Sequence, residues 1–158
     1  MTNYQKIGAF IVSLTIPLAV GGISAFFTVS AIPGWYRTIS KPEWNPPNWI
    51  FGPVWTSLYV LMGVAFFATW ITPQTPKRQK ALYLNAGQLV LNFFWSLIFF
   101  NLHAIWWALL EIVCLWILIV LTMIAYDRVN KLSAWLMLPY IVWVTFATIL
   151  NFAIWQLN

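Results

Sequence analysis

The sequence predicts an all-α integral membrane protein, with residues 1–158 forming a single domain of five transmembrane helices. The composition is the first reason: 62% of the residues are hydrophobic and 7% are charged, whereas an ordinary soluble domain is about 25% charged. The second reason is the presence of five long apolar segments, each near the roughly 20 residues that a helix needs to cross a bilayer core. The third is that most links between these segments are short, so neighbouring helices must run antiparallel.

The elements follow in order along the chain. The first apolar segment continues to about Thr28, too far for the short apolar core of a signal peptide, so we expect a retained helix. A long link follows it, and the other links are short. The predicted spans are residues 7–27, 51–71, 81–100, 104–126 and 132–157, and the long link covers about 28–50.

The basic residues predict an orientation. With five spans, the N-terminus and the links at 72–80 and 127–131 share one side of the membrane. That side carries Lys6, Lys77, Arg78, Lys80, Arg128 and Lys131. The other side carries Arg37 and Lys41 only. The positive-inside rule then places the N-terminus on the inner face, with a bacterial membrane favoured over the mitochondrial outer membrane. Basic residues scattered in this way argue against a nucleic-acid partner.

The stretch KPEWNPPNWIFGPVW, residues 41–55, holds three tryptophans and four prolines at the start of the second span. Pro46 and Pro47 stiffen the entry, and Pro53 is tolerated in a first helical turn, where its missing N–H has no partner in any case. A rigid helix start with tryptophans at the membrane interface explains most of these residues. It does not explain Trp55, which lies one turn deeper.

Helical spacing places aromatic and polar side chains on common faces of four spans. These faces are Trp55, Tyr59, Met62 and Phe66; Gln88, Asn92, Trp95 and Ser96; Trp107, Leu110 and Cys114; and Trp143, Ala147 and Leu150. Buried amides in a membrane need partners, so the second face should point into the bundle. Ordinary helix packing remains one interpretation. A pocket for a flat, largely apolar ligand is the other, because membrane helices usually pack through small residues.

Four stretches of the chain resemble the translocator protein family, also called tryptophan-rich sensory proteins or peripheral-type benzodiazepine receptors. They are WYRTISKPEWNPPNWIFGPVWTSLYVLMG (35–63), GQLVLNFFWSLIFF (87–100), WAL (107–109) and LMLPYIVWVTFATILNFAIW (136–155). The resemblance implies a five-helix bundle whose pocket opens toward the long first loop. It implies binding of porphyrins, haem and isoquinoline- or benzodiazepine-type ligands, with no required cofactor. The sequence itself shows no metal-ligand spacing, so no metal site is expected. Carried over by motif, the pocket residues are Trp55, Asn92, Trp95, Trp107, Cys114, Trp143, Ala147 and Leu150, and Trp35, Pro46 and Pro47 belong to a lid loop.

Three functions stay open at this stage. The favoured one is a membrane receptor or carrier for tetrapyrroles, used in transport or stress sensing. The first alternative is an enzyme that degrades porphyrin with light and oxygen, a reaction attributed in the family to tryptophans that match Trp55 and Trp143. The second alternative is a small-molecule exporter, in which Glu111 would be the intramembrane acid.

Two departures from the family pattern affect the expected partners. Phe152 and Gln156 stand where animal members have the tyrosine and basic residue of a cholesterol motif, so cholesterol binding is not expected. A homodimer is expected from the resemblance, but Tyr83, four residues before Gly87, blocks a small-residue contact there. His103 is expected to be a turn residue and not a haem ligand.

Overall fold

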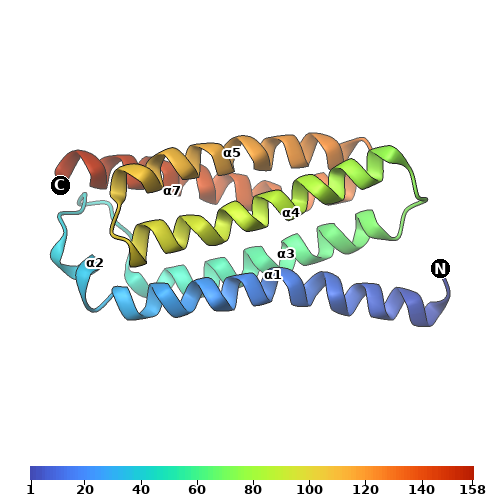
Figure 1. Ribbon diagram of the computed structural model, residues 1–158, viewed down its shortest axis with the longest axis horizontal. Coiled ribbons are helices and arrows are strands. Elements are labelled where there is room, and N and C mark those ends of the chain that lie inside the picture. Colours follow the sequence, from blue (N-terminus) through green and yellow to red (C-terminus); the bar gives the residue numbers. More distant parts are fainter.

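A computed structural model describes all residues from 1 to 158 and shows five long antiparallel helices side by side (Figure 1). All five are long and apolar enough to cross a membrane, which confirms the predicted fold class. The elements are α1 (Asn3–Ala31), α2 (Trp35–Thr38), η1 (Asn48–Ile50), α3 (Phe51–Trp70), α4 (Pro76–Ser96), η2 (Leu97–Asn101), α5 (Ile105–Asp127), α6 (Lys131–Leu136) and α7 (Leu138–Leu157). The N- and C-termini lie at opposite ends of the bundle.

Several helices extend beyond their apolar segments because polar residues cap them. Helix α1 starts at Asn3 and ends at Ala31, so it is four residues longer at each end than the predicted span 7–27. Its start is a capping box, in which the Gln5 backbone N–H donates to Thr2 Oγ1 (3.3 Å) and the Thr2 N–H donates to Gln5 Oε1 (2.8 Å). Helix α4 likewise starts before its apolar run, capped by the Thr75 side chain.

Two glycines let α1 and α3 approach closely. A Cβ atom on Gly63 would lie 2.8 Å from Leu14 Cδ2 and 2.9 Å from Leu14 Cα. A Cβ atom on Gly21 would lie 2.4 Å from the ring of Tyr59. Small residues at such contacts are typical of packing between membrane helices.

A chain of buried hydrogen bonds joins α3, α4 and α7 in the middle of the bundle. The Tyr59 hydroxyl donates to Asn92 Oδ1, and Asn92 Nδ2 donates to the Tyr140 hydroxyl at 3.0 Å. The Tyr140 hydroxyl donates in turn to Gln88 Oε1 at 2.9 Å, and Gln88 Nε2 donates to Asn85 Oδ1 at 3.2 Å. The amides of α4 therefore face the interior, as their cost in lipid predicts.

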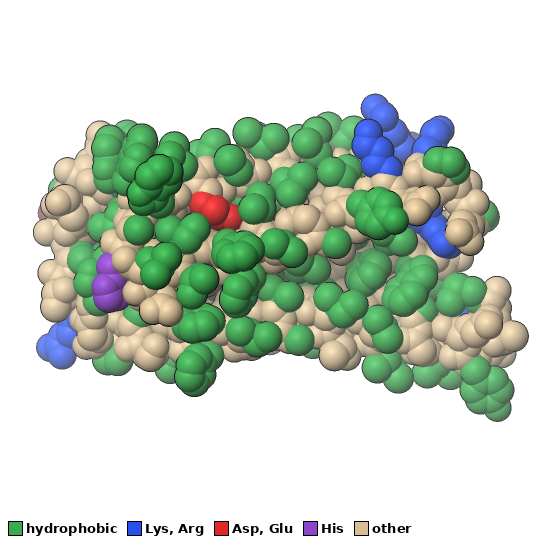
Figure 2. All heavy atoms as spheres, in the orientation of Figure 1, with side chains coloured by type: hydrophobic (Ala, Val, Ile, Leu, Met, Phe, Trp, Pro, Cys, Tyr) green, Lys and Arg blue, Asp and Glu red, His purple; other side chains and the backbone are tan.

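The outside of the bundle is apolar along most of its length. Hydrophobic side chains cover the middle of the face in Figure 2, and Lys and Arg gather mainly at the end that carries the N-terminus, with a further basic group at the other end. This distribution suits a protein whose middle contacts lipid and whose ends contact water.

Candidate ligand cavity

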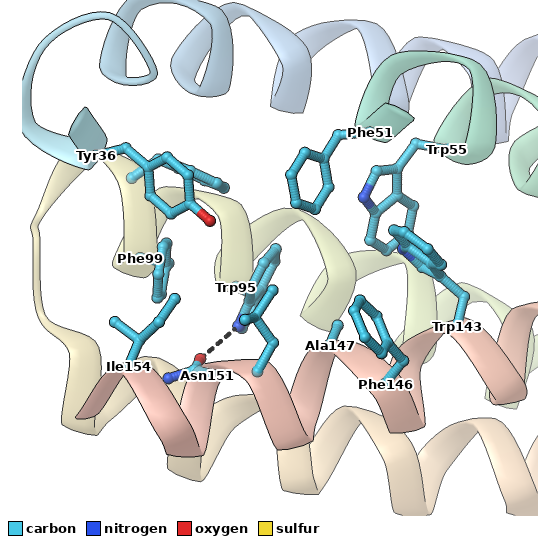
Figure 3. A pocket seen from close by; sticks show the side chains of 12 residues that line it. Tyr36, Phe51, Trp55, Trp95, Phe99, Trp143, Phe146, Ala147, Asn151 and Ile154 are labelled. Carbon is cyan, nitrogen blue, oxygen red and sulfur yellow. Dashed lines mark hydrogen bonds between the residues drawn. The ribbon is translucent and has the colours of Figure 1, made fainter. Parts of the chain in front are cut away.

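A cavity lies between α3, α4 and α7, at the end of the bundle where the α1–α3 connection crosses (Figure 3). Asn151 is the single lining residue that is not hydrophobic. The lining residues are Tyr36, Phe51, Trp55, Trp95, Phe99, Phe100, Trp143, Phe146, Ala147, Leu150, Asn151 and Ile154.

Trp95 is a rigid wall of this cavity. Its indole Nε1 donates to Asn151 Oδ1 at 3.1 Å, and Asn151 Nδ2 donates to the carbonyl oxygen of Ile105 at 3.1 Å. Its ring stacks on Phe99, with centroids 5.4 Å apart. One face and the polar edge of this indole are therefore constrained before any ligand arrives.

Two adjacent phenylalanines reach the cavity because α4 ends in a π-helical turn. Phe99 and Phe100 belong to η2, and both are buried. A π-turn widens the helix locally and is frequent at functional sites. The π-turn places these consecutive aromatic side chains beside Trp95 and Tyr36. The ring centroids of Phe99 and Phe100 are 4.9 Å apart.

Trp143 offers an unused hydrogen-bond donor. Its ring packs at 5.4 Å from Phe146 and 6.0 Å from Phe51. Its indole nitrogen is buried and has no hydrogen-bond partner in the protein. A buried donor without an acceptor costs about 1–3 kcal/mol, so a ligand that supplies an acceptor here would recover that energy.

The cavity is narrow in this conformation. The space open to the centre of a water-sized sphere is ≈ 30 Å³, and one water molecule needs about 10–15 Å³ on that measure. The structure therefore shows a closed form. A flat macrocycle would enter only if the aromatic rings of the lining moved, or if the α1–α3 connection (32–50), here called the covering loop, moved.

The covering loop is held shut by local polar contacts. The Tyr36 hydroxyl donates to Asn45 Oδ1 at 2.9 Å, and Lys41 Nζ donates to the carbonyl oxygen of Tyr36 at 2.7 Å. At its far side, Ser40 exchanges two 2.9 Å hydrogen bonds with the side chain of Asn158. Burial raises the pKa of Tyr36 to about 12, while the hydrogen bond to Asn45 acts in the opposite direction.

The predicted lid residues lie in this covering segment but outside the cavity wall. Trp35 stacks on His103, a residue of the turn before α5, with ring centroids 4.4 Å apart. Pro46 is half-buried and Pro47 is exposed. His103 itself has a positive φ of 55°, in keeping with its predicted place in a turn.

The structure brings together five of the predicted pocket residues, and they line the cavity: Trp55, Trp95, Trp143, Ala147 and Leu150. Two more, Tyr59 and Asn92, lie just outside the cavity in the buried hydrogen-bond chain. Trp55 stacks on Tyr59 with centroids 5.6 Å apart, which links that chain to the cavity.

Trp107 and Cys114 are not at the cavity, and this prediction needs correction. The side chain of Trp107 is 65% exposed, and Cys114 is also exposed. They share one face of α5, as their spacing predicts, but that face is on the outside of the bundle. Lipid accepts apolar side chains as readily as a core does, so spacing alone could not decide which way this face points.

Sequence reasoning missed several lining residues. They are Tyr36, Phe51, Phe99, Phe100, Phe146, Asn151 and Ile154. Ile154 continues the series Trp143, Ala147 and Leu150 at the next helical step, so that signal was present. The π-turn of η2 and the fold of the loop around Tyr36 leave no comparable periodic signal.

Glu111 lies apart from the cavity lining. Both of its carboxylate oxygens are buried and have no hydrogen-bond partner in the protein. The structure contains no group of three or more His, Cys, Asp or Glu side chains that could hold a metal ion.

Fold and cavity together define a class: a five-helix membrane protein with an aromatic cavity covered by its longest connection. The model of the TspO/MBR family matches residues 13–156, and the chain belongs to this family. The chain is 45% identical to the tryptophan-rich protein TspO of Chlorobaculum tepidum over 142 residues, 89% of this chain and 90% of the relative. It is 38% identical to the translocator protein of Homo sapiens over 126 residues, 78% of this chain and 75% of the relative. It is 37% identical to the tryptophan-rich sensory protein of Cereibacter sphaeroides over 124 residues, 78% of this chain and 77% of the relative.

Proposed function

We propose that the chain is a membrane receptor or carrier that binds a flat tetrapyrrole, such as a porphyrin or haem, in the aromatic cavity. The observation that carries the proposal is a cavity walled by indole and phenyl rings from three helices, with one indole N–H, that of Trp143, both buried and unpaired (Figure 3). Such rings stack favourably on a flat π-system. Isoquinoline- and benzodiazepine-type ligands have the same flat, largely apolar character.

The cavity's few polar groups give the ligand an orientation. Trp143 Nε1 is free to donate to an acceptor on the ligand, whereas Trp95 Nε1 is already bonded to Asn151. A mostly apolar pocket with few polar groups is the usual design of a site for small organic molecules. We therefore expect one edge of the macrocycle to face Trp143.

Binding requires the closed cavity to open. The loop contacts at Tyr36 and Ser40 are few and polar, so they can break and re-form without disturbing the helices. Movement of this loop would open the cavity at that end of the bundle, and the ligand would enter there. The ligand would then replace ring-to-ring contacts with ring-to-macrocycle contacts of similar strength.

Titration of the purified protein with protoporphyrin IX tests the proposal. Bound porphyrin should quench tryptophan fluorescence, because several indoles line one cavity. Replacing Ala147 by Leu should overpack the cavity wall, at a cost of about 1–3 kcal/mol, which is a loss of roughly 5- to 150-fold in affinity. Ala19→Leu is the matched control, since Ala19 is exposed on α1. Unchanged affinity in Ala147→Leu would place the ligand elsewhere.

One observation favours light-driven porphyrin degradation as a second candidate. Trp55 on α3 and Trp143 on α7 both line the same cavity, so two oxidisable indoles would adjoin an illuminated porphyrin in the presence of oxygen. Absorbance of the complex in the dark and under illumination separates the two functions. A spectrum stable in light supports a receptor, and bleaching to new products supports an enzyme.

A further inference from the structure

A second cleft lies at the opposite end of the bundle from the aromatic cavity, at the end that carries the N-terminus. It is formed by the α3–α4 turn and the α5–α6 turn, which lie at the same end (Figure 1). The lining residues are Thr72, Pro73, Thr75, Pro76, Lys77, Arg128 and Val129. Its open volume is ≈ 480 Å³, which is much larger than the aromatic cavity and sufficient for a phosphodiester group.

The two walls of this cleft are held in place by the protein itself. Asn130 Nδ2 donates to the carbonyl oxygen of Ala68 at 3.0 Å, and Thr69 Oγ1 donates to Ser133 Oγ at 2.9 Å. These bonds tie the α5–α6 turn to the end of α3. The cleft is therefore a fixed feature of the fold, formed before any ligand binds.

The side chain of Arg78 stabilises the α3–α4 turn by hydrogen bonds to backbone carbonyl groups. Arg78 Nη1 donates to the carbonyl oxygens of Trp70 (3.0 Å) and Thr72 (2.7 Å). The Nε atom of the same guanidinium group is buried and has no partner in the protein. Arg78 is not part of the cleft lining, so its role is to stabilise the turn, and Lys77 and Arg128 are the cations that line the cleft.

Lys77 and Arg128 give the cleft its positive charge. They stand on opposite walls, both are exposed, and neither has a side-chain hydrogen bond or ion pair within the protein. No acidic residue lines the cleft; Asp127 is next to Arg128 in the chain but is not part of the lining. Helix α4 begins here with Thr75 as its N-cap, so its dipole also favours an anion.

The surroundings of the cleft favour a lipid as the source of the anion. Ile71, Leu132 and Trp135 flank the two turns in sequence and are exposed, and Trp135 is 67% exposed. Tryptophan beside basic residues marks the boundary between hydrocarbon and headgroups. A phosphate in the cleft would thus have its acyl chains next to an apolar protein surface.

The geometry points to a binding site for the phosphate of an anionic phospholipid headgroup between Lys77 and Arg128. The site holds the lipid by these two cations and by the start of α4, whereas the Thr72 hydroxyl already donates to the carbonyl oxygen of Thr69 at 2.7 Å. It is separate from the tetrapyrrole site and does not depend on it.

The test uses full-length protein in mixed micelles that contain equal amounts of phosphatidylglycerol and phosphatidylcholine, with retained lipid counted by native mass spectrometry. We expect phosphatidylglycerol to be retained in preference. The double variant Lys77→Gln/Arg128→Gln should lower that preference roughly tenfold or more, as expected for the loss of two interfacial cations. Neither side chain has a protein partner, so the fold should persist, and the thermal unfolding profile checks this.

The matched control is Lys6→Gln/Lys80→Gln, which removes the same charge from exposed residues at the same end but outside the cleft. Retention unchanged in the control and reduced in the cleft variant supports the site. An equal reduction in both variants would show a diffuse charge effect and overturn it. Complete displacement of the lipid by inorganic phosphate would identify a free-phosphate site and overturn the lipid assignment.

Discussion

The close contact between α1 and α3 gives a prediction whose size can be worked from the structure. In Gly63→Ala the new Cβ atom would lie 2.8 Å from Leu14 Cδ2, 2.9 Å from Leu14 Cα and 2.9 Å from the carbonyl oxygen of Ser13. Ordinary contacts between carbon atoms are about 3.5–4.0 Å. Two of these three neighbours are backbone atoms, so a rotamer change cannot relieve the contact. The helices must separate by roughly 0.6 Å or more.

The expected cost follows from comparison with a second glycine. Overpacking costs about 1–3 kcal/mol, and alanine in a helix gains roughly 0.5–1 kcal/mol over glycine. Gly22→Ala is the matched control, because a Cβ atom there meets nothing within 4 Å. The helix-propensity gain is common to both variants and cancels in the comparison. Gly63→Ala should therefore be less stable than Gly22→Ala by about 1–3 kcal/mol.

Reversible unfolding in mixed micelles, driven by increasing sodium dodecyl sulfate and followed by circular dichroism, measures the two free energies of unfolding. Gly22→Ala should equal or slightly exceed the unmodified protein. If Gly63→Ala and Gly22→Ala unfold at the same detergent fraction, α1 and α3 do not pack as closely as described, and the predicted overpacking at Gly63 is refuted.

Three further outcomes are expected. Trp55→Phe should weaken protoporphyrin binding tenfold or less, because a ring still covers the ligand and stacking is worth about 0.5–1.5 kcal/mol; rapid, multiple-turnover bleaching that disappears in this variant would instead establish an enzyme. Cholesterol should bind no better than to an unrelated membrane protein, and Phe152→Tyr with Gln156→Arg should raise its affinity; tight sterol binding by the unmodified chain would contradict this. The loop around Tyr36 should loosen as pH rises from about 10 to about 12, because the raised pKa means that the closed loop holds the proton more tightly than the open one. Tryptophan fluorescence should report that opening, and Tyr36→Phe should not show this step.

The five helices and much of the cavity follow from the sequence by direct physical rules. Amides are costly in lipid, so the face with Gln88 and Asn92 had to point inward, and both side chains are buried. Trp95 shares that face, and Trp55 and Trp143 occupy equivalent faces of α3 and α7. Length and hydropathy predicted the spans because a bilayer core admits only helices of about that length.

Other features were decided only by the tertiary structure. The face of α5 with Trp107 and Cys114 points outward, and no rule based on hydrophobicity could assign it, because lipid and protein core are both apolar. Phe99 and Phe100 point inward because α4 ends in a π-helical turn. The loop closes at Tyr36 through a hydrogen bond to Asn45, which lies nine residues away in an irregular segment. Periodicity describes regular helices, so side chains placed by irregular backbone or by contacts between distant segments lie beyond its reach.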